Sequence, residues 1–219
     1  MASRPKQPAP RPAPRLYLIT PQLVNTSAFS PQLRIALDRA DIAAVLLRLA
    51  DADERTLINR AKSVATAVQD KGAALLLDGR AELVARAGGD GAHLTGIAAF
   101  TDALEQLKPD RIAGAGGLAS RHDAMLAAEQ GADYVMFGEP DAAGGRPTFA
   151  AIEERVAWWA EVFEIPCVGY AASINEVAPL VAAGADFVAL GDFLWRDPNA
   201  IAQIMSEATR QIELPEPAT

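Results

Sequence analysis

The chain has 219 residues, of which 50% are apolar and 22% are charged, and its formal net charge is −8. These values fit a globular protein with a sizeable core, and the acidic excess argues against nucleic acid, whose phosphates are bound by clustered Lys and Arg. No apolar stretch reaches the roughly 20 residues of a membrane span, and the start has no apolar signal-peptide core. The lone cysteine, Cys167, can form no internal disulfide. We therefore expect a cytoplasmic protein that does not bind membranes.

The two ends of the chain differ in composition from the rest. Residues 1–14 alternate prolines with Arg and Lys, and residues 213–219 contain two further prolines. Such segments bury little apolar surface, so we expect a flexible N-terminal tail and a frayed C-terminus. One domain is expected over residues 15–212.

Eight short apolar runs alternate with longer amphipathic stretches between these ends. Continuous apolar runs of four to eight residues are typical of parallel strands buried on both faces. The runs are Leu16–Thr20, Ile42–Leu47, Ala73–Leu77, Gly91–Leu94, Arg111–Ala115, Tyr134–Phe137, Cys167–Tyr170 and Phe187–Leu190.

A repeated helix stop supports the same β/α cycle. Gly-x-Asp recurs three times just before an apolar run, over residues 88–90, 131–133 and 184–186. Glycine after a helix supplies a left-handed C-cap without steric cost. Eight such units predict an α/β fold, a single compact (β/α)8 TIM barrel. An open doubly wound sheet is the alternative, but no G-x-G-x-x-G follows the first strand.

Four segments carry a family resemblance. They are the first strand Leu16–Thr20, the Asp-Gly-Ala-His-Leu of residues 90–94, residues 131–140 with their Gly-Glu-Pro turn, and residues 183–189. Together they resemble the thiamine phosphate synthase family and its thiazole tautomerase relatives, from Leu16 to about Trp195. The resemblance implies a small barrel that is usually a homodimer. It also implies an enzyme that joins hydroxymethylpyrimidine diphosphate to thiazole phosphate, with magnesium, and releases diphosphate.

Several positions depart from the pattern that the resemblance implies. Ala50 stands in place of a lysine, Gly79 in place of a metal-binding aspartate, and Ala98 in place of a second metal carboxylate. Gly191 replaces a serine, and residues 144–147 replace a Thr-x-Thr-Lys loop. This pattern indicates a divergent family member with altered or lost chemistry. We expect no metal; if the family reaction survives, magnesium is the cofactor and Asp78 a weak candidate ligand.

Four polar residues at strand ends are the candidate catalytic residues, because strand ends of a barrel point at the active site. Arg48 suits a phosphate or carboxylate ligand, or else a structural salt bridge. Asp78 and Arg80 contact a ligand, pair with each other or cap the next helix. His93 is an acid or base, or a hydrogen-bonded core histidine.

A second set of residues is expected to bind a ligand or phosphate through backbone N–H groups or a new cation. The set is Gly114, Gly116, Gly138, Arg146, Ala171, Ala172 and Gly191. The glycines alternatively serve tight turns, and Arg146 alternatively lies at a solvated loop tip.

Two functional hypotheses follow. The first is a thiamine phosphate synthase-like enzyme that acts on a small phosphorylated pyrimidine or thiazole-type ligand. The second is a non-catalytic ligand-binding or interaction protein on the same barrel. Adjacent Trp158 and Trp159 cannot both face the sheet, so one of them favours a homodimer interface.

Overall fold

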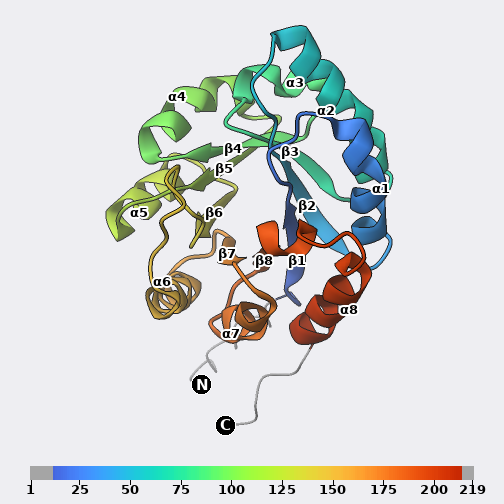
Figure 1. Cartoon of the computed structure of the whole chain (residues 1–219). Helices are drawn as coiled ribbons and strands as arrows, with labels where there is room; N and C mark the ends of the chain where they lie inside the picture. The colour runs from blue at the N-terminus through green and yellow to red at the C-terminus, as the bar shows by residue number, and fades with distance from the viewer. Residues whose placement is uncertain (1–11, 214–219) are drawn as a thin grey trace, which may run out of the picture.

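The computed structural model describes residues 12–213 and folds them into a closed barrel of eight parallel strands (Figure 1). The first strand pairs with both the second and the eighth, so the predicted barrel is confirmed and the open sheet is wrong. All eight apolar runs form strands, with each end within one residue of the prediction. The strands are β1 (Arg15–Ile19), β2 (Ile42–Leu47), β3 (Ala74–Asp78), β4 (Gly91–Thr95), β5 (Ile112–Gly116), β6 (Tyr134–Phe137), β7 (Cys167–Ala171) and β8 (Phe187–Leu190).

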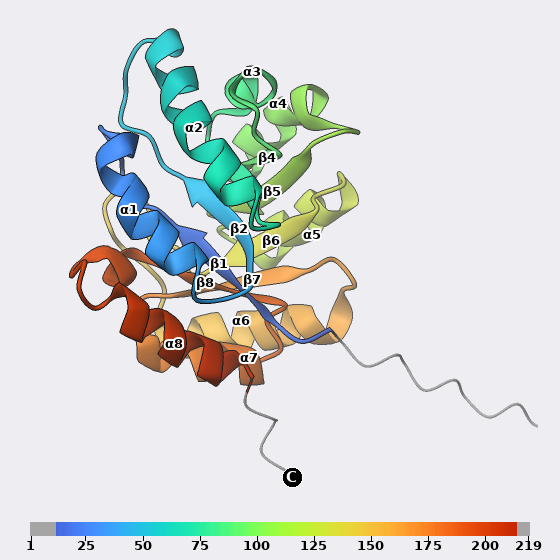
Figure 2. The same cartoon turned by 90° about the vertical axis from the view of Figure 1, so that its right-hand side faces the viewer.

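Helices follow the strands and cover the outside of the barrel (Figures 1 and 2). They are α1 (Thr26–Leu37), α2 (Glu54–Gln69), α3 (Val84–Ala87), α4 (Ile97–Leu107), α5 (Arg121–Glu129), α6 (Phe149–Val162), α7 (Val177–Ala182) and α8 (Ile201–Ile212). Short 3-10 turns precede three of them, at Ala81–Leu83, Ile174–Glu176 and Asp192–Trp195. Within residues 12–213, no helix is long and apolar enough to cross a membrane. Most of the two predicted tails lies outside the described residues, so the expectation of flexible ends stays a prediction.

Each strand contributes to two cores, because successive side chains point to opposite faces of a sheet. The outer core, between strands and helices, is mostly aliphatic and includes Cys167, which is buried. The inner core combines aliphatic side chains with three tyrosines, Tyr17, Tyr134 and Tyr170. A buried phenol needs a hydrogen-bond partner, so the inside of this barrel has to be partly polar.

The three Gly-x-Asp stops share one structure. Their glycines, at positions 88, 131 and 184, have left-handed φ angles of 73°, 97° and 92°. Each following aspartate accepts a backbone hydrogen bond from the preceding strand. The bonds run from Leu75 to Asp90 (2.7 Å), from Ala113 to Asp133 (2.7 Å) and from Cys167 to Asp186 (2.8 Å). The repeat therefore ties β3 to β4, β5 to β6 and β7 to β8.

The two ends of the barrel chain are joined directly. The Arg15 backbone N–H donates to the Asp186 carbonyl oxygen over 3.2 Å, beside the β1–β8 pairing. The indole N–H of Trp195 donates to the Ile19 carbonyl oxygen over 2.6 Å, and its ring packs edge-on against Phe29. The last strand and the turn after it thus close the barrel on the first strand.

The aspartate repeat predicts a measurable loss of stability on Asp90→Ala. Leu75 is fully buried, and its N–H would lose its carboxylate acceptor. An unsatisfied buried donor costs about 1–3 kcal/mol, so the free energy of unfolding in urea should fall by that amount. Asp90→Asn keeps an acceptor oxygen and should lose less. Asp102→Ala, on the exposed surface of α4, is the matched control; an equal loss in both alanine variants would contradict the proposed tie.

Candidate active site

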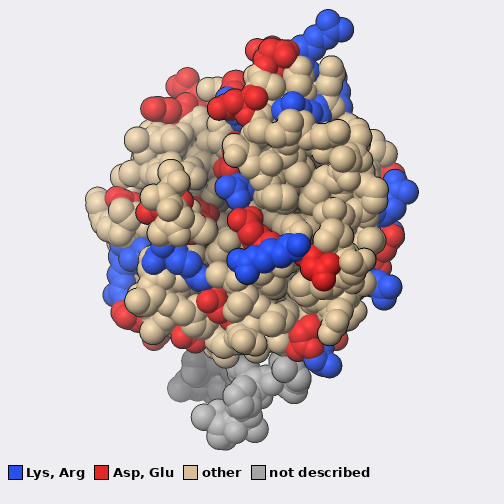
Figure 3. All heavy atoms as spheres, viewed as in Figure 1, with Lys and Arg blue, Asp and Glu red and all other residues tan. Residues whose placement is uncertain are grey.

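A cavity of about 720 Å³ opens at the carboxyl ends of the strands. Figure 3 shows basic and acidic side chains side by side around the hollow on this face. Five of the predicted site residues line the cavity: Arg48, Asp78, His93, Arg146 and Ala172. The barrel therefore brings together residues that lie up to 124 positions apart in the sequence.

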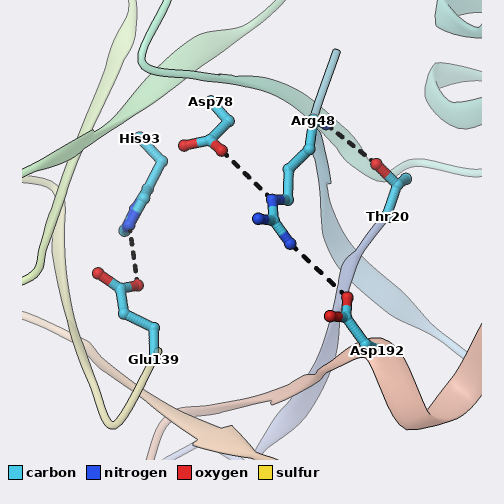
Figure 4. A network of polar contacts seen from close by, with 6 residues as sticks. All are labelled: Thr20, Arg48, Asp78, His93, Glu139 and Asp192. Atoms are coloured by element: carbon cyan, nitrogen blue, oxygen red, sulfur yellow. Dashed lines mark hydrogen bonds and ion pairs between the residues drawn. The ribbon is translucent and has the colours of Figure 1, made fainter. Parts of the chain in front are cut away.

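Arg48 is held at its backbone and lies between two carboxylates. Its N–H donates to the hydroxyl of buried Thr20, at the end of β1, over 3.0 Å. Its guanidinium Nε lies 3.4 Å from Asp78, and its Nη1 lies 3.6 Å from Asp192 (Figure 4). Both predicted interpretations of Arg48 therefore find support, since it forms ion pairs and also lines the cavity.

A column of polar side chains runs through the barrel to the cavity. The hydroxyls of Tyr17 and Tyr134 lie 3.0 Å apart, and the Tyr134 hydroxyl lies 2.9 Å from His93 Nδ1. His93 Nε2 lies 3.1 Å from the Glu139 carboxylate (Figure 4). His93 is 1% exposed, so the expected hydrogen-bonded core histidine is present, and it also forms part of the cavity wall.

The neighbouring charges decide the protonation of His93. Burial by itself lowers the pKa of an imidazole, but the charge of Glu139 and its hydrogen bond, with the charge of Asp78, raise the pKa of His93 above its ordinary value. Burial also raises the pKa of Tyr17 and of Tyr134, so both phenols stay neutral. A protonated His93 donates from both nitrogens, to Glu139 on one side and to Tyr134 on the other.

Arg146 is not at a solvated loop tip, and that alternative is wrong. Its side chain is 18% exposed and forms an ion pair with Glu176 at 3.0 Å. It also donates to the Tyr170 carbonyl oxygen over 3.3 Å and stacks over the Tyr170 ring. Glu176 in turn accepts from the Ala172 N–H over 2.7 Å. These contacts fasten the loop after β6 to the end of β7.

The predicted glycines lie against the inner side chains of the barrel. A Cβ on Gly114 would meet the Tyr134 ring at 2.1 Å, and a Cβ on Gly191 would meet the Tyr170 hydroxyl at 2.1 Å. Gly116 lies equally close to Glu139. These glycines make room for buried polar groups.

Two of the remaining predicted positions also pack inside the protein. Gly138 has a φ of 93° and packs on Ile152, and Ala171 is buried in the outer core. Backbone binding of a phosphate by the glycines and by Ala171 stays a prediction.

Arg80 does not pair with Asp78, and that expectation is wrong. Arg80 forms an ion pair with Asp51, away from the residues that line the cavity. Asp78 turns instead toward Arg48 on the neighbouring strand. A ligand-binding role for Arg80 stays a prediction, and its side chain does not line the cavity.

The carboxylates beside Arg48 are paired with that arginine and are not gathered into a cluster of metal ligands. Magnesium is held by carboxylate oxygens and retained waters. Across residues 12–213, no group of three or more His, Cys, Asp or Glu side chains could hold a metal ion. Asp78 and Asp192, two of the carboxylates in this wall, are both turned to Arg48.

The sequence analysis missed Glu139, Tyr170 and Asp192 as site residues. Glu139 follows the end of β6 by two positions, which is the same signal that selected Arg48 and Asp78. Asp192 directly follows the predicted Gly191 after β8, so it carries the same signal of a polar residue at a strand end. Tyr170 gave no such signal, because a tyrosine within an apolar strand does not reveal which face it occupies.

The fold and the cavity define a (β/α)8 barrel with its site at the strand ends. The family model of thiamine monophosphate synthase matches residues 16–193. The thiamine-phosphate synthase of Rhodospirillum centenum is 39% identical over 199 residues, which cover 90% of this chain and 96% of that protein. The enzyme of that name from Hyphomonas neptunium is 39% identical over 201 residues, covering 88% and 91%. This chain belongs to the thiamine monophosphate synthase family.

A solved structure shows the same fold at lower identity. Thiamine phosphate pyrophosphorylase from Pyrococcus furiosus matches with a TM-score of 0.72 and 19% identity, over 91% of this chain and 95% of that one. The resemblance inferred from the four sequence segments is therefore confirmed for both family and fold.

Gly116→Ala should disrupt the end of the polar column. The new Cβ would lie 2.1 Å from Glu139 Oε1 and 2.5 Å from His93 Nε2, so one of these groups must move. Overpacking of this kind costs about 1–3 kcal/mol, which urea unfolding would measure. Gly89→Ala is the control, because its Cβ would meet nothing closer than 3.4 Å. Equal stability of the two variants would show that Glu139 is not fixed against Gly116.

Glu139→Gln should reverse the pKa shift of His93. With the carboxylate charge removed, burial dominates and the pKa of His93 should fall below its ordinary value. In the wild type the raised pKa means that this pair stabilises the fold below about pH 6.5 and loses that contribution as the pH rises through the folded-state pKa. Imidazole NMR titration would follow both effects, with exposed His122 as the internal control. A His93 titration that is identical in the wild type and the variant would contradict the assignment.

Proposed function

We propose that the cavity binds a small phosphorylated pyrimidine or thiazole-type ligand, and that magnesium-dependent joining chemistry is altered or lost in this chain. Altered or lost chemistry is supported by the ion pairs that two cavity arginines form with carboxylates of the protein. Arg48 lies between two carboxylates and Arg146 is held by Glu176. A reaction that frees diphosphate has to neutralise several negative charges in its transition state. Arginines already neutralised within the protein serve that purpose poorly.

The residues of this chain suit binding and proton storage. His93 and Glu139 hold a proton beside the cavity, and the fixed hydroxyls of Tyr134 and Tyr17 keep the ring oriented. Arg196 lies at the rim and is exposed. A guanidinium in that position suits a phosphate group. Asp78 and Asp192, the carboxylates that could hold magnesium here, are both ion-paired with Arg48.

Two alternative functions are each favoured by a specific observation. The names of the relatives from R. centenum and H. neptunium favour an ordinary thiamine-phosphate synthase. The ion pair of Arg146 with Glu176 and the column around His93 favour a non-catalytic ligand-binding or interaction protein. The assay below separates the first of these from our proposal.

We further propose that the protein is a cytoplasmic homodimer. Trp159 is fully buried against the barrel, whereas Trp158 lies partly exposed beside the Arg121 guanidinium. Val162, on the same helix, is also exposed. Aromatic and arginine side chains are enriched in interfaces, so the outer surface of α6 is the expected contact.

The purified protein should show little or no magnesium-dependent synthesis of thiamine phosphate. Each missing electrostatic group commonly lowers a rate by about 10²–10³, so the combined loss should bring turnover close to background. The assay would supply hydroxymethylpyrimidine diphosphate, thiazole phosphate and magnesium, with an ordinary synthase of the family run in parallel. Turnover within about tenfold of that enzyme, and its loss on Asp78→Ala, would establish the synthase instead.

A further inference from the structure

The charges that line the cavity nearly cancel. Three arginines contribute to its wall: Arg48, Arg146 and Arg196. Four carboxylates contribute as well: Asp78, Glu139, Asp141 and Asp192. A site built for a polyanion carries an excess of cationic groups, so this balance needs a different explanation.

Arg48 is the centre of this balance. Its backbone is fixed from two sides, because its N–H donates to Thr20 and its carbonyl accepts from Leu23. Its guanidinium lies within ion-pair distance of Asp78 at the end of β3 and of Asp192 after β8, so the pairs link the ends of β2, β3 and β8 (Figure 4). The three side chains are 33–59% exposed, so a ligand in the cavity can reach them.

Neither Arg146 nor Arg196 forms an ion pair with Asp78 or Asp192. The Arg146 Nη1 forms an ion pair with Glu176 in an arrangement that is more than four-fifths buried, and its buried Nε has no hydrogen-bond partner among the described residues. Arg196 is exposed at the rim and forms no ion pair with any residue in the described range 12–213. An anion can therefore use one unpaired guanidinium at the rim, while the interior presents Asp78 and Asp192 on either side of Arg48.

We propose that Asp78 and Asp192 are specificity-determining residues that neutralise Arg48, so that the cavity accepts a ligand with a single phosphate and rejects diphosphate. The inference rests on the proposed function and names the charge class of its ligand. A monophosphate can share Arg196 and one face of Arg48. Diphosphate carries further negative charge, which has to lie beside the two carboxylates, and like charges at this range repel. The two aspartates thus act by repulsion, which is a general way to reject a competing ligand.

The test uses inorganic phosphate and inorganic diphosphate as probes, titrated calorimetrically into the purified full-length protein with a chelator present. The wild type should bind diphosphate no more tightly than phosphate. Asp192→Asn and the double variant with Asp78→Asn remove the repelling charges. Diphosphate affinity should rise in both variants, by about tenfold or more in the double variant, which corresponds to about one pKa unit of interaction or more for the two removed charges together.

Three controls keep the result interpretable. Asp102→Asn, on exposed α4, removes one negative charge elsewhere and should leave both affinities unchanged. Arg48→Gln added to the double variant should abolish the gain. Asp192 is the most exposed member of the group, so Asp192→Asn keeps the test valid if the double variant unfolds in a thermal melt.

The outcomes separate this proposal from the proposed function. Wild-type diphosphate binding about tenfold tighter than phosphate binding, or aspartate variants without any gain, would overturn the specificity role. A repeat with magnesium chloride should give no gain in diphosphate affinity; a gain that Asp78→Asn abolishes would also overturn it. A protein that binds phosphate, and that gains diphosphate binding only when the aspartates are removed, would support it, whereas a wild type that binds neither probe would overturn the acceptance of a single phosphate. None of these titrations measures synthase turnover, so the proposed function stands or fails separately.

Discussion

The hydrogen bonds that join Tyr17, Tyr134, His93 and Glu139 set the composition of the barrel interior. Most barrels of this class fill that space with layers of branched aliphatic side chains. A polar column in the same space has to be satisfied at every member, because an unpaired buried polar group is costly. The chain meets this demand with a continuous series of contacts of 2.9–3.1 Å, except at Glu139 Oε1, which is buried without a hydrogen-bond partner among the described residues. Glycines at positions 114 and 116 supply the volume that the rings and the carboxylate need.

The same column divides the cavity into two electrostatic regions. On one side a buried histidine is hydrogen-bonded to a carboxylate, and on the other a partly exposed arginine lies between two aspartates (Figure 4). Charges in the buried region interact strongly because little water screens them, whereas those around Arg48 remain open to solvent and to ligands. The two groups therefore differ in how strongly their charges interact and in how easily a ligand can reach them.

Much of the fold was accessible from the sequence, and less of the site was. Continuous apolar runs mark strands that are buried on both faces, which located every strand, but the same property hides which face points inward. Tyr170 and Tyr134 were therefore not recognised as inner residues. The partners of Arg80 and Arg146 come from other β/α units, Asp51 and Glu176, and only the curvature of the barrel sets these distances. Arg48 and Asp78 could be selected because they directly follow strands.

The bond from Trp195 to Ile19 joins residues that are 176 positions apart, and it has a consequence for synthesis of the chain on the ribosome. At about 5–20 residues per second, β1 emerges roughly 10–35 s before the segment that completes its second edge. For that interval one side of β1 exposes unpaired backbone groups, which is the kind of edge that pairs with other chains. For most of its translation the nascent protein thus has an unpaired edge on β1. That edge is paired only when β8 and Trp195 have left the ribosome.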